Sequence, residues 1–131
     1  MTHATALAFI GKAERALTAA RILLRTEDTE GACSRAYYAM FDAARASLIA
    51  TGHLHEGMNI KTHAGVIAAF GQALVQTGQI DAAFGRAFNR LQDVRVRADY
   101  MAGSPSAEEA AWAVTQAEAF VATMRAQFFR A

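Results

Sequence analysis

The sequence predicts an all-α fold, an up-and-down antiparallel bundle of about five helices. Alanine accounts for 32 of the 131 residues and proline for one, a composition that favours closely packed helices. Apolar residues recur at alternating spacings of three and four, which is the period of an amphipathic helix. No segment alternates apolar and polar residues as a strand does. We expect one domain, residues 1–131, with a single core.

The net charge and the cysteine count limit which kinds of binding site and cellular compartment we expect for this chain. The net charge is +1, so any binding to nucleic acid must come from a local patch and not from the whole-chain field. Cys33 is the only cysteine, which excludes a disulfide framework and a cysteine metal cluster and favours a reducing compartment. No signal-peptide pattern and no long apolar run occur, so we expect a cytoplasmic protein with no membrane segment.

The first two helices follow from one apolar seam and one cap. The first is expected from about Thr5 to Arg25, and the second from about Glu30 to Ala50, with Gly52 as its stop. Asp28 or Thr29 is a candidate N-cap for the second. Because the connecting loop is short, the two should be antiparallel neighbours. The predicted seam of the first consists of Ala6, Ile10, Ala13, Leu17, Ala20 and Leu24.

A polar line runs along the second helix. Its members, at spacings of three, four and three, are Arg35, Tyr38, Asp42 and Arg45. One interpretation is a solvated face with internal ion pairs, each contributing a few tenths of a kcal/mol. The other is one wall of a groove.

The opposite wall would come from the fourth helix, which covers Phe84 to Tyr100 after an N-cap at Asp81. Arg95 and Asp99 are four residues apart and lie beside the apolar stripe, not opposite it. Arg97 and Tyr100 belong to a second polar line. These side chains either form an ordinary solvated face or build a site with the line on the second helix.

The histidines suggest no metal centre. His53, His55 and Glu56 lie in an expected loop and match no known zinc spacing, so we expect no metal and no cofactor. His63 begins the third helix, which is expected to continue to about Gln76 after a start at Thr62 or Lys61. Taken alone, a single histidine at a helix start favours a structural role.

The last helix has the clearest boundary. Ser106 and Glu109 form a Ser-x-x-Glu capping box directly after Pro105. Phe120, Phe129 and Trp112 lie off the predicted seam of this helix, so we expect apolar surface for a second copy of the chain, although Trp112 could equally cover a helix crossing.

Three stretches together carry a family resemblance. Ser34-Arg35-Ala36-Tyr37-Tyr38-Ala39-Met40-Phe41-Asp42 resembles the second helix of HEPN domains, and Thr62-His63-Ala64-Gly65-Val66 resembles their third-helix motif. Arg95-Val96-Arg97-Ala98-Asp99-Tyr100 is similar to the Arg-x-x-Ala-Asp-Tyr motif of the small stand-alone branch. The resemblance covers nearly the whole chain.

The resemblance implies a two-fold homodimer and a genetic neighbour. Many such proteins are paired with a minimal nucleotidyltransferase, the two acting as toxin and antitoxin. Active members are metal-independent ribonucleases with an Arg-x4–6-His motif, in which histidine transfers protons and arginine stabilises charge at phosphorus. It also implies RNA or a nucleotide as the bound partner.

This chain departs from that motif, since no histidine follows an arginine at the required distance. Either His63 reaches the groove from the third helix, or Asp99 and Tyr100 replace the histidine, or the domain binds without cutting. The candidate catalytic residues are therefore Arg95, Asp99, Tyr100 and His63, and the candidate nucleotide- or RNA-binding residues are Arg35, Tyr38, Asp42 and Arg97.

Two classes of function remain open. One is the toxin or partner component of a nucleotidyltransferase-linked toxin–antitoxin system. The other is a non-catalytic dimeric nucleotide-binding or scaffold module. The resemblance also implies that Tyr100 is a candidate site at which the nucleotidyltransferase partner attaches AMP. The alternative is that the ring of Tyr100 packs at the edge of a dimer.

Overall fold

A computed structural model of the chain describes residues 3–55, 62–101 and 103–129. The elements in these ranges are α1 (His3–Arg25), α2 (Thr29–Ala50), α3 (His63–Phe70), the π-helical turn η1 (Gly71–Val75), α4 (Ala82–Tyr100) and α5 (Ala107–Phe128). The described part contains no strand, which confirms the all-α prediction. No helix in these ranges is both long enough and apolar enough to cross a membrane.

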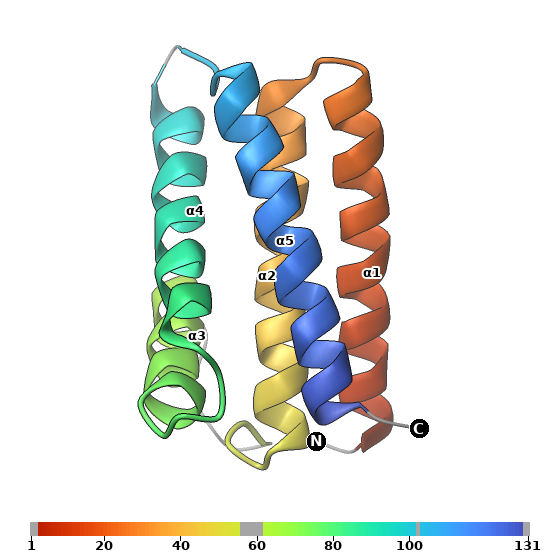
Figure 1. Cartoon of the computed structure of the whole chain (residues 1–131), viewed down its shortest axis with the longest axis vertical. Coiled ribbons are helices and arrows are strands. Elements are labelled where there is room, and N and C mark those ends of the chain that lie inside the picture. The colour runs from red at the N-terminus through yellow and green to blue at the C-terminus, as the bar shows by residue number, and fades with distance from the viewer. Residues whose placement is uncertain (1–2, 56–61, 102, 130–131) are drawn as a thin grey trace.

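The four long helices run up and down beside one another (Figure 1). α1 begins and α5 ends at the same end of the bundle, while short α3 lies near the start of α4. α2 is the central element, because it contacts α1, α3, α4 and α5. Its alanines allow this close approach: Ala32, Ala36, Ala39, Ala43, Ala44 and Ala46 are all fully buried.

The predicted caps are present. The side chain of Asp28 accepts a hydrogen bond from the amide of Gly31, and that of Asp81 accepts one from the amide of Ala83. Thr62 caps α3 through the amide of Gly65. The capping box between Ser106 and Glu109 forms in both directions. Gly52 adopts a positive φ of 79° just after α2, where a residue without a Cβ has no steric penalty.

One helix differs from its expected course. The sequence predicts a continuous third helix to about Gln76, but the backbone widens into a π turn at Gly71–Val75. The amide of Gln76 donates to the carbonyl of Gly71 over 2.8 Å, an i to i+5 bond. Residues 56–61 of the expected loop, including Glu56, lie outside the described residues.

Aromatic side chains fill the core between α3, α4 and α5. Phe120 is fully buried, and its ring centroid lies 5.2 Å from that of Phe70 and 5.4 Å from that of Phe88. Phe120 therefore belongs to the core and not to surplus surface. Trp112 is half-buried with the guanidinium of Arg90 4.1 Å from its ring centroid, so its ring covers part of the α4–α5 surface.

Candidate functional site

His63 lies against the centre of α2. Its Nδ1 is 2.7 Å from the hydroxyl oxygen of Tyr37, within hydrogen-bond distance. Its ring stacks on Phe41 with centroids 4.5 Å apart and is nearly parallel to the ring of Tyr37 at 5.5 Å. The cap at Thr62 sets this position, because it starts α3 one residue before the histidine. Thus His63 reaches the face of α2 that α4 also covers.

Arg95 approaches the same tyrosine from α4. Its guanidinium carbon lies 4.7 Å from the ring centroid of Tyr37 and 5.9 Å from that of Tyr38. Nε and one terminal nitrogen donate to the side-chain oxygen of Gln92 over 3.2 and 3.1 Å, and the other terminal nitrogen donates to Asp99 over 3.0 Å. We call Tyr37, Phe41, His63 and Arg95 the histidine–arginine cluster.

The electrostatics of the cluster hold His63 neutral. Burial lowers the pKa of His63 from its usual value near 6.5, and the nearby cations Arg95 and Arg45 lower this pKa further. Burial raises the pKa of Tyr37, against an opposing effect of Arg95, so its hydroxyl keeps its proton. A neutral imidazole beside a fixed guanidinium can accept a proton while the cation stabilises negative charge.

The polar line on α2 borders one hollow against α1, and Tyr38 in this line also reaches α4. Tyr38 faces α4, as the distance to Arg95 shows, while the guanidinium of Arg35 lies 5.1 Å from the Tyr38 ring centroid. Asp42 instead is buried and accepts a hydrogen bond from Arg45 over 3.0 Å. Arg35, Tyr38, Asp42 and Arg45 all line a hollow against α1 with a volume of about 450 Å³.

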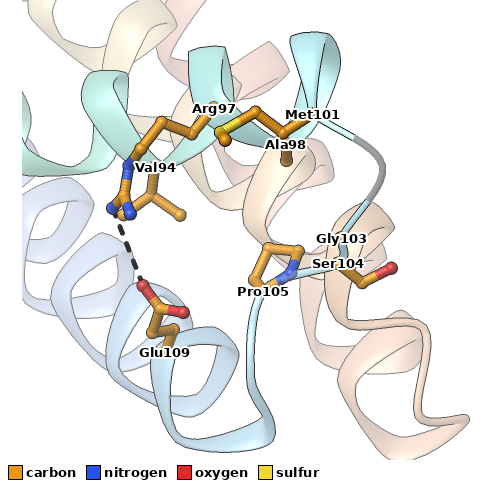
Figure 2. Close-up of a pocket in the computed structure, with 8 residues that line it drawn as sticks. All are labelled: Val94, Arg97, Ala98, Met101, Gly103, Ser104, Pro105 and Glu109. Atoms are coloured by element: carbon orange, nitrogen blue, oxygen red, sulfur yellow. Dashed lines mark ion pairs between the residues drawn. The ribbon is translucent and has the colours of Figure 1, made fainter.

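Arg97 has its ion-pair partner on α5 and not in the cluster, and Figure 2 shows the side chains of Arg97 and Glu109 facing each other. It points toward α5, where its guanidinium is 3.8 Å from the carboxylate of Glu109 across a small hollow of about 200 Å³. Met101 lines the same hollow and is exposed, and Val94 is the last buried residue of α4, so the buried stripe ends before the last turn of this helix. Tyr100 is 85% exposed.

The sequence alone does not assign Tyr37, Gln92 or the cations of α1 to the site. The signal for Tyr37 is its place next to Tyr38, since two adjacent aromatic rings on a helix both come within reach of Arg95 and His63. The signal for Lys12 and Arg15 is their position beside Ala16 and Ala19, whose small side chains leave space next to long cations.

Comparison with known proteins identifies relatives along almost the whole chain. The family model of the HEPN domain matches residues 6–127. A protein of Methanocaldococcus jannaschii named as a putative toxin is 40% identical over 114 residues, which cover 87% of this chain and 81% of that protein. A UPF0332 protein of Thermotoga maritima is 35% identical over 68% of this chain and 64% of its own length.

A second protein of Methanocaldococcus jannaschii that is also named as a putative toxin is 34% identical over 70% of this chain and 58% of its own length. The family model and the first of these relatives both extend across the segments that supply His63 and Arg95. The chain therefore belongs to the HEPN domain family.

Proposed function

We propose that this chain is a toxin-type HEPN protein that binds single-stranded RNA at the histidine–arginine cluster and cleaves it without a metal. The observation that carries the proposal is that His63 from α3 and Arg95 from α4 both contact Tyr37 of α2. A histidine and an arginine are thereby brought together from two helices in a chain that lacks the one-helix motif. The toxin names of two relatives support the role.

The chemistry follows from the two side chains. Neutral His63 removes the proton from a ribose 2′-hydroxyl, and the resulting oxygen attacks the adjacent phosphorus. The bond from phosphorus to the 5′-oxygen breaks, and that oxygen takes a proton back from the imidazolium. The products are a 2′,3′-cyclic phosphate and a 5′-hydroxyl end. Arg95 stabilises the extra negative charge at phosphorus with the N–H groups that Gln92 and Asp99 leave free.

The test is cleavage of end-labelled single-stranded RNA in EDTA, with products resolved on a denaturing gel. His63→Gln should slow cleavage by about 10² to 10⁴-fold, the usual contribution of a proton-transfer group. His53→Gln is the matched control, because His53 is an exposed histidine that contacts Thr51 outside the cluster. An all-deoxy strand should stay intact. Cleavage that is equally fast in His63→Gln would contradict the proposal.

A second function is favoured by one observation. Three N–H groups of Arg95 already donate to Gln92 and Asp99, and the hydroxyl of Tyr37 already contacts His63. A cluster bonded in this way suits a rigid, non-cutting module that binds RNA or a nucleotide. RNA binding by fluorescence anisotropy with no cleavage product at any protein concentration would select this alternative.

The assembly belongs to the same proposal. We propose a two-fold homodimer and a minimal nucleotidyltransferase as antitoxin. Light scattering at micromolar concentration should give about twice the chain mass of 14.1 kDa. Induced expression should arrest growth, and pull-down from the native lysate should recover the nucleotidyltransferase. A clean monomer would contradict the dimer, and growth unaffected by induced expression would contradict the toxin role.

A further inference from the structure

A second hollow lies between α1 and α2, beside the histidine–arginine cluster. Four cations line it, Lys12 and Arg15 from α1 and Arg35 and Arg45 from α2, with Asp42 as the one carboxylate. Four positive charges and one negative charge leave the lining with a net charge of +3, against +1 for the whole chain. We call this hollow the α1–α2 pocket. Its charge points to an anionic ligand.

Most of this charge is not neutralised by the protein. Arg45 pairs with Asp42, but Lys12, Arg15 and Arg35 form no ion pair among the described residues. Elsewhere on the bundle surface, Arg21 is paired with Glu118 and Arg125 with Glu14. Like charges held close together repel one another, so an anion that binds between them gains from all of them.

Arg45 also has bonding capacity left. Its guanidinium lies 4.1 Å from the ring centroid of Phe9 and 4.8 Å from that of Phe41, which fixes the side chain in place. One terminal nitrogen donates to Asp42, while the buried Nε has no hydrogen-bond partner among the described residues. A buried donor without an acceptor costs free energy, so a ligand oxygen that reached it would be favoured.

The α1–α2 pocket and the histidine–arginine cluster share a wall. Tyr38 and Phe41 line the pocket, and their ring centroids lie 5.8 and 4.5 Å from that of His63. A ligand held in the pocket is therefore next to the imidazole. The volume of about 450 Å³ falls within the ~300–1,000 Å³ typical of small-molecule sites. Aromatic walls beside cations are the surroundings that a base and its phosphate prefer.

Two other hollows among the described residues do not share these properties. The one in Figure 2 holds a single Arg97–Glu109 pair and has less than half the volume. One near η1, lined by Ala64, Gln72 and Asn89 among others, has no charged residue in its lining. Cationic charge and aromatic walls are combined in the α1–α2 pocket.

We propose that the α1–α2 pocket is a phosphate subsite that holds the ribose phosphate next to the one acted on at His63. The ligand chemistry is a phosphate ester on ribose, and we assign it to the RNA strand, so this proposal rests on the function proposed above. In this arrangement Lys12, Arg15 and Arg35 bind and orient the strand, and they take no part in proton transfer.

The test compares two doubly substituted proteins of equal charge. Lys12→Gln with Arg15→Gln removes two cations from the pocket, and Arg25→Gln with Arg86→Gln removes two exposed cations elsewhere. The probe is a short fluorescein-labelled single-stranded RNA, followed by anisotropy over a series of salt concentrations. Thermal unfolding of each variant verifies that it is folded, and Arg35→Gln alone is a further variant if the double pocket variant is not.

The pocket variant should bind the RNA about tenfold more weakly, and the slope of log K against log salt should fall by roughly 0.7 for each phosphate that the variant no longer neutralises. The control variant should bind within twofold of the unchanged protein. Equal binding by both variants would overturn the proposal. RNA that binds the unchanged protein with this dependence on the pocket, but is not cut, would contradict the proposed cleavage alone. A failure of the cleavage is therefore distinguishable from a failure of the pocket.

A calorimetric titration with AMP and with adenosine separates the two sources of phosphate. RNA binding that depends on the pocket, with AMP bound weakly or not at all, supports the assignment to the strand. AMP binding that is lost in the pocket variant, with RNA binding unchanged, would overturn that assignment in favour of a free nucleotide. Adenosine that binds as well as AMP would overturn the phosphate assignment altogether.

Discussion

Replacement of Arg95 by methionine tests whether the cluster is a fixed structure or a solvated face. Methionine keeps an unbranched apolar stem against Tyr37 but removes the charge and all five N–H donors. If Arg95 were an exposed ion-pair partner, its loss would cost well under about 1 kcal/mol of stability. The side chain of Arg95 is in fact only 16% exposed, which changes this expectation.

The magnitude comes from three interactions. The guanidinium at 4.7 Å from the Tyr37 centroid contributes about 0.5–2 kcal/mol as a cation–π pair. The hydrogen bonds to Gln92 contribute about 1 kcal/mol net. The pair with Asp99, whose side chain is 48% exposed, is screened by water and contributes only a few tenths, about 0.3–0.5 kcal/mol. We expect Arg95→Met to lower the free energy of unfolding by about 2 kcal/mol, and Tm by roughly 7 °C.

Urea denaturation followed by circular dichroism measures this loss. Arg86→Met is the control, because Arg86 is exposed on the same helix, and it should change stability by less than about 0.5 kcal/mol. Asp99→Asn should cost well under about 1 kcal/mol, since it removes only the screened pair. A loss in Arg95→Met no larger than in Arg86→Met would refute the stacking, and failure of Arg95→Met to fold at all would make Arg95 chiefly structural.

Three further predictions concern other groups. The pKa of His63 is lowered in the folded state. The contribution of neutral His63 to stability is therefore present above pH ~6.5 and is lost as the pH falls below that value toward the folded pKa. His63→Gln should flatten this part of a plot of unfolding free energy against pH. Burial, and to a lesser degree Glu109, raises the pKa of Cys33 to about 11. The native protein at pH ~8 should therefore react with a thiol reagent far more slowly than the urea-unfolded protein. Equal rates would contradict the buried position of Cys33. Tyr100 is exposed, so coexpression with a minimal nucleotidyltransferase of the kind proposed above should add the mass of AMP to this chain and not to Tyr100→Phe. An adduct that persists in the variant would exclude Tyr100 as the modified residue.

Local signals were sufficient for the helix starts. Asp28, Asp81 and Ser106 each satisfy free amides within their own first turn, so their effect does not depend on distant residues. The apolar period likewise predicted the buried face of α1, where Ala6, Ile10, Ala13, Leu17 and Ala20 are buried and only Leu24 is half-buried. The π turn at Gly71–Val75 was not predictable in this way, since a change from i+4 to i+5 bonding leaves no periodic mark over five residues.

The sequence by itself determined that arginine, tyrosine and histidine occur at matching places on three helices. It could not decide which of them meet, because a helical face has several neighbours and only packing selects among them. Only the tertiary structure placed His63 and Arg95 on Tyr37, turned Asp42 and Arg45 toward Lys12 and Arg15, and left Arg97 with Glu109 on α5. The physical reason is the alanine-rich surface of α2, which lets α1, α3, α4 and α5 all pack against it. The α1–α2 pocket and the histidine–arginine cluster therefore lie side by side, with Tyr38 between the pocket and Arg95.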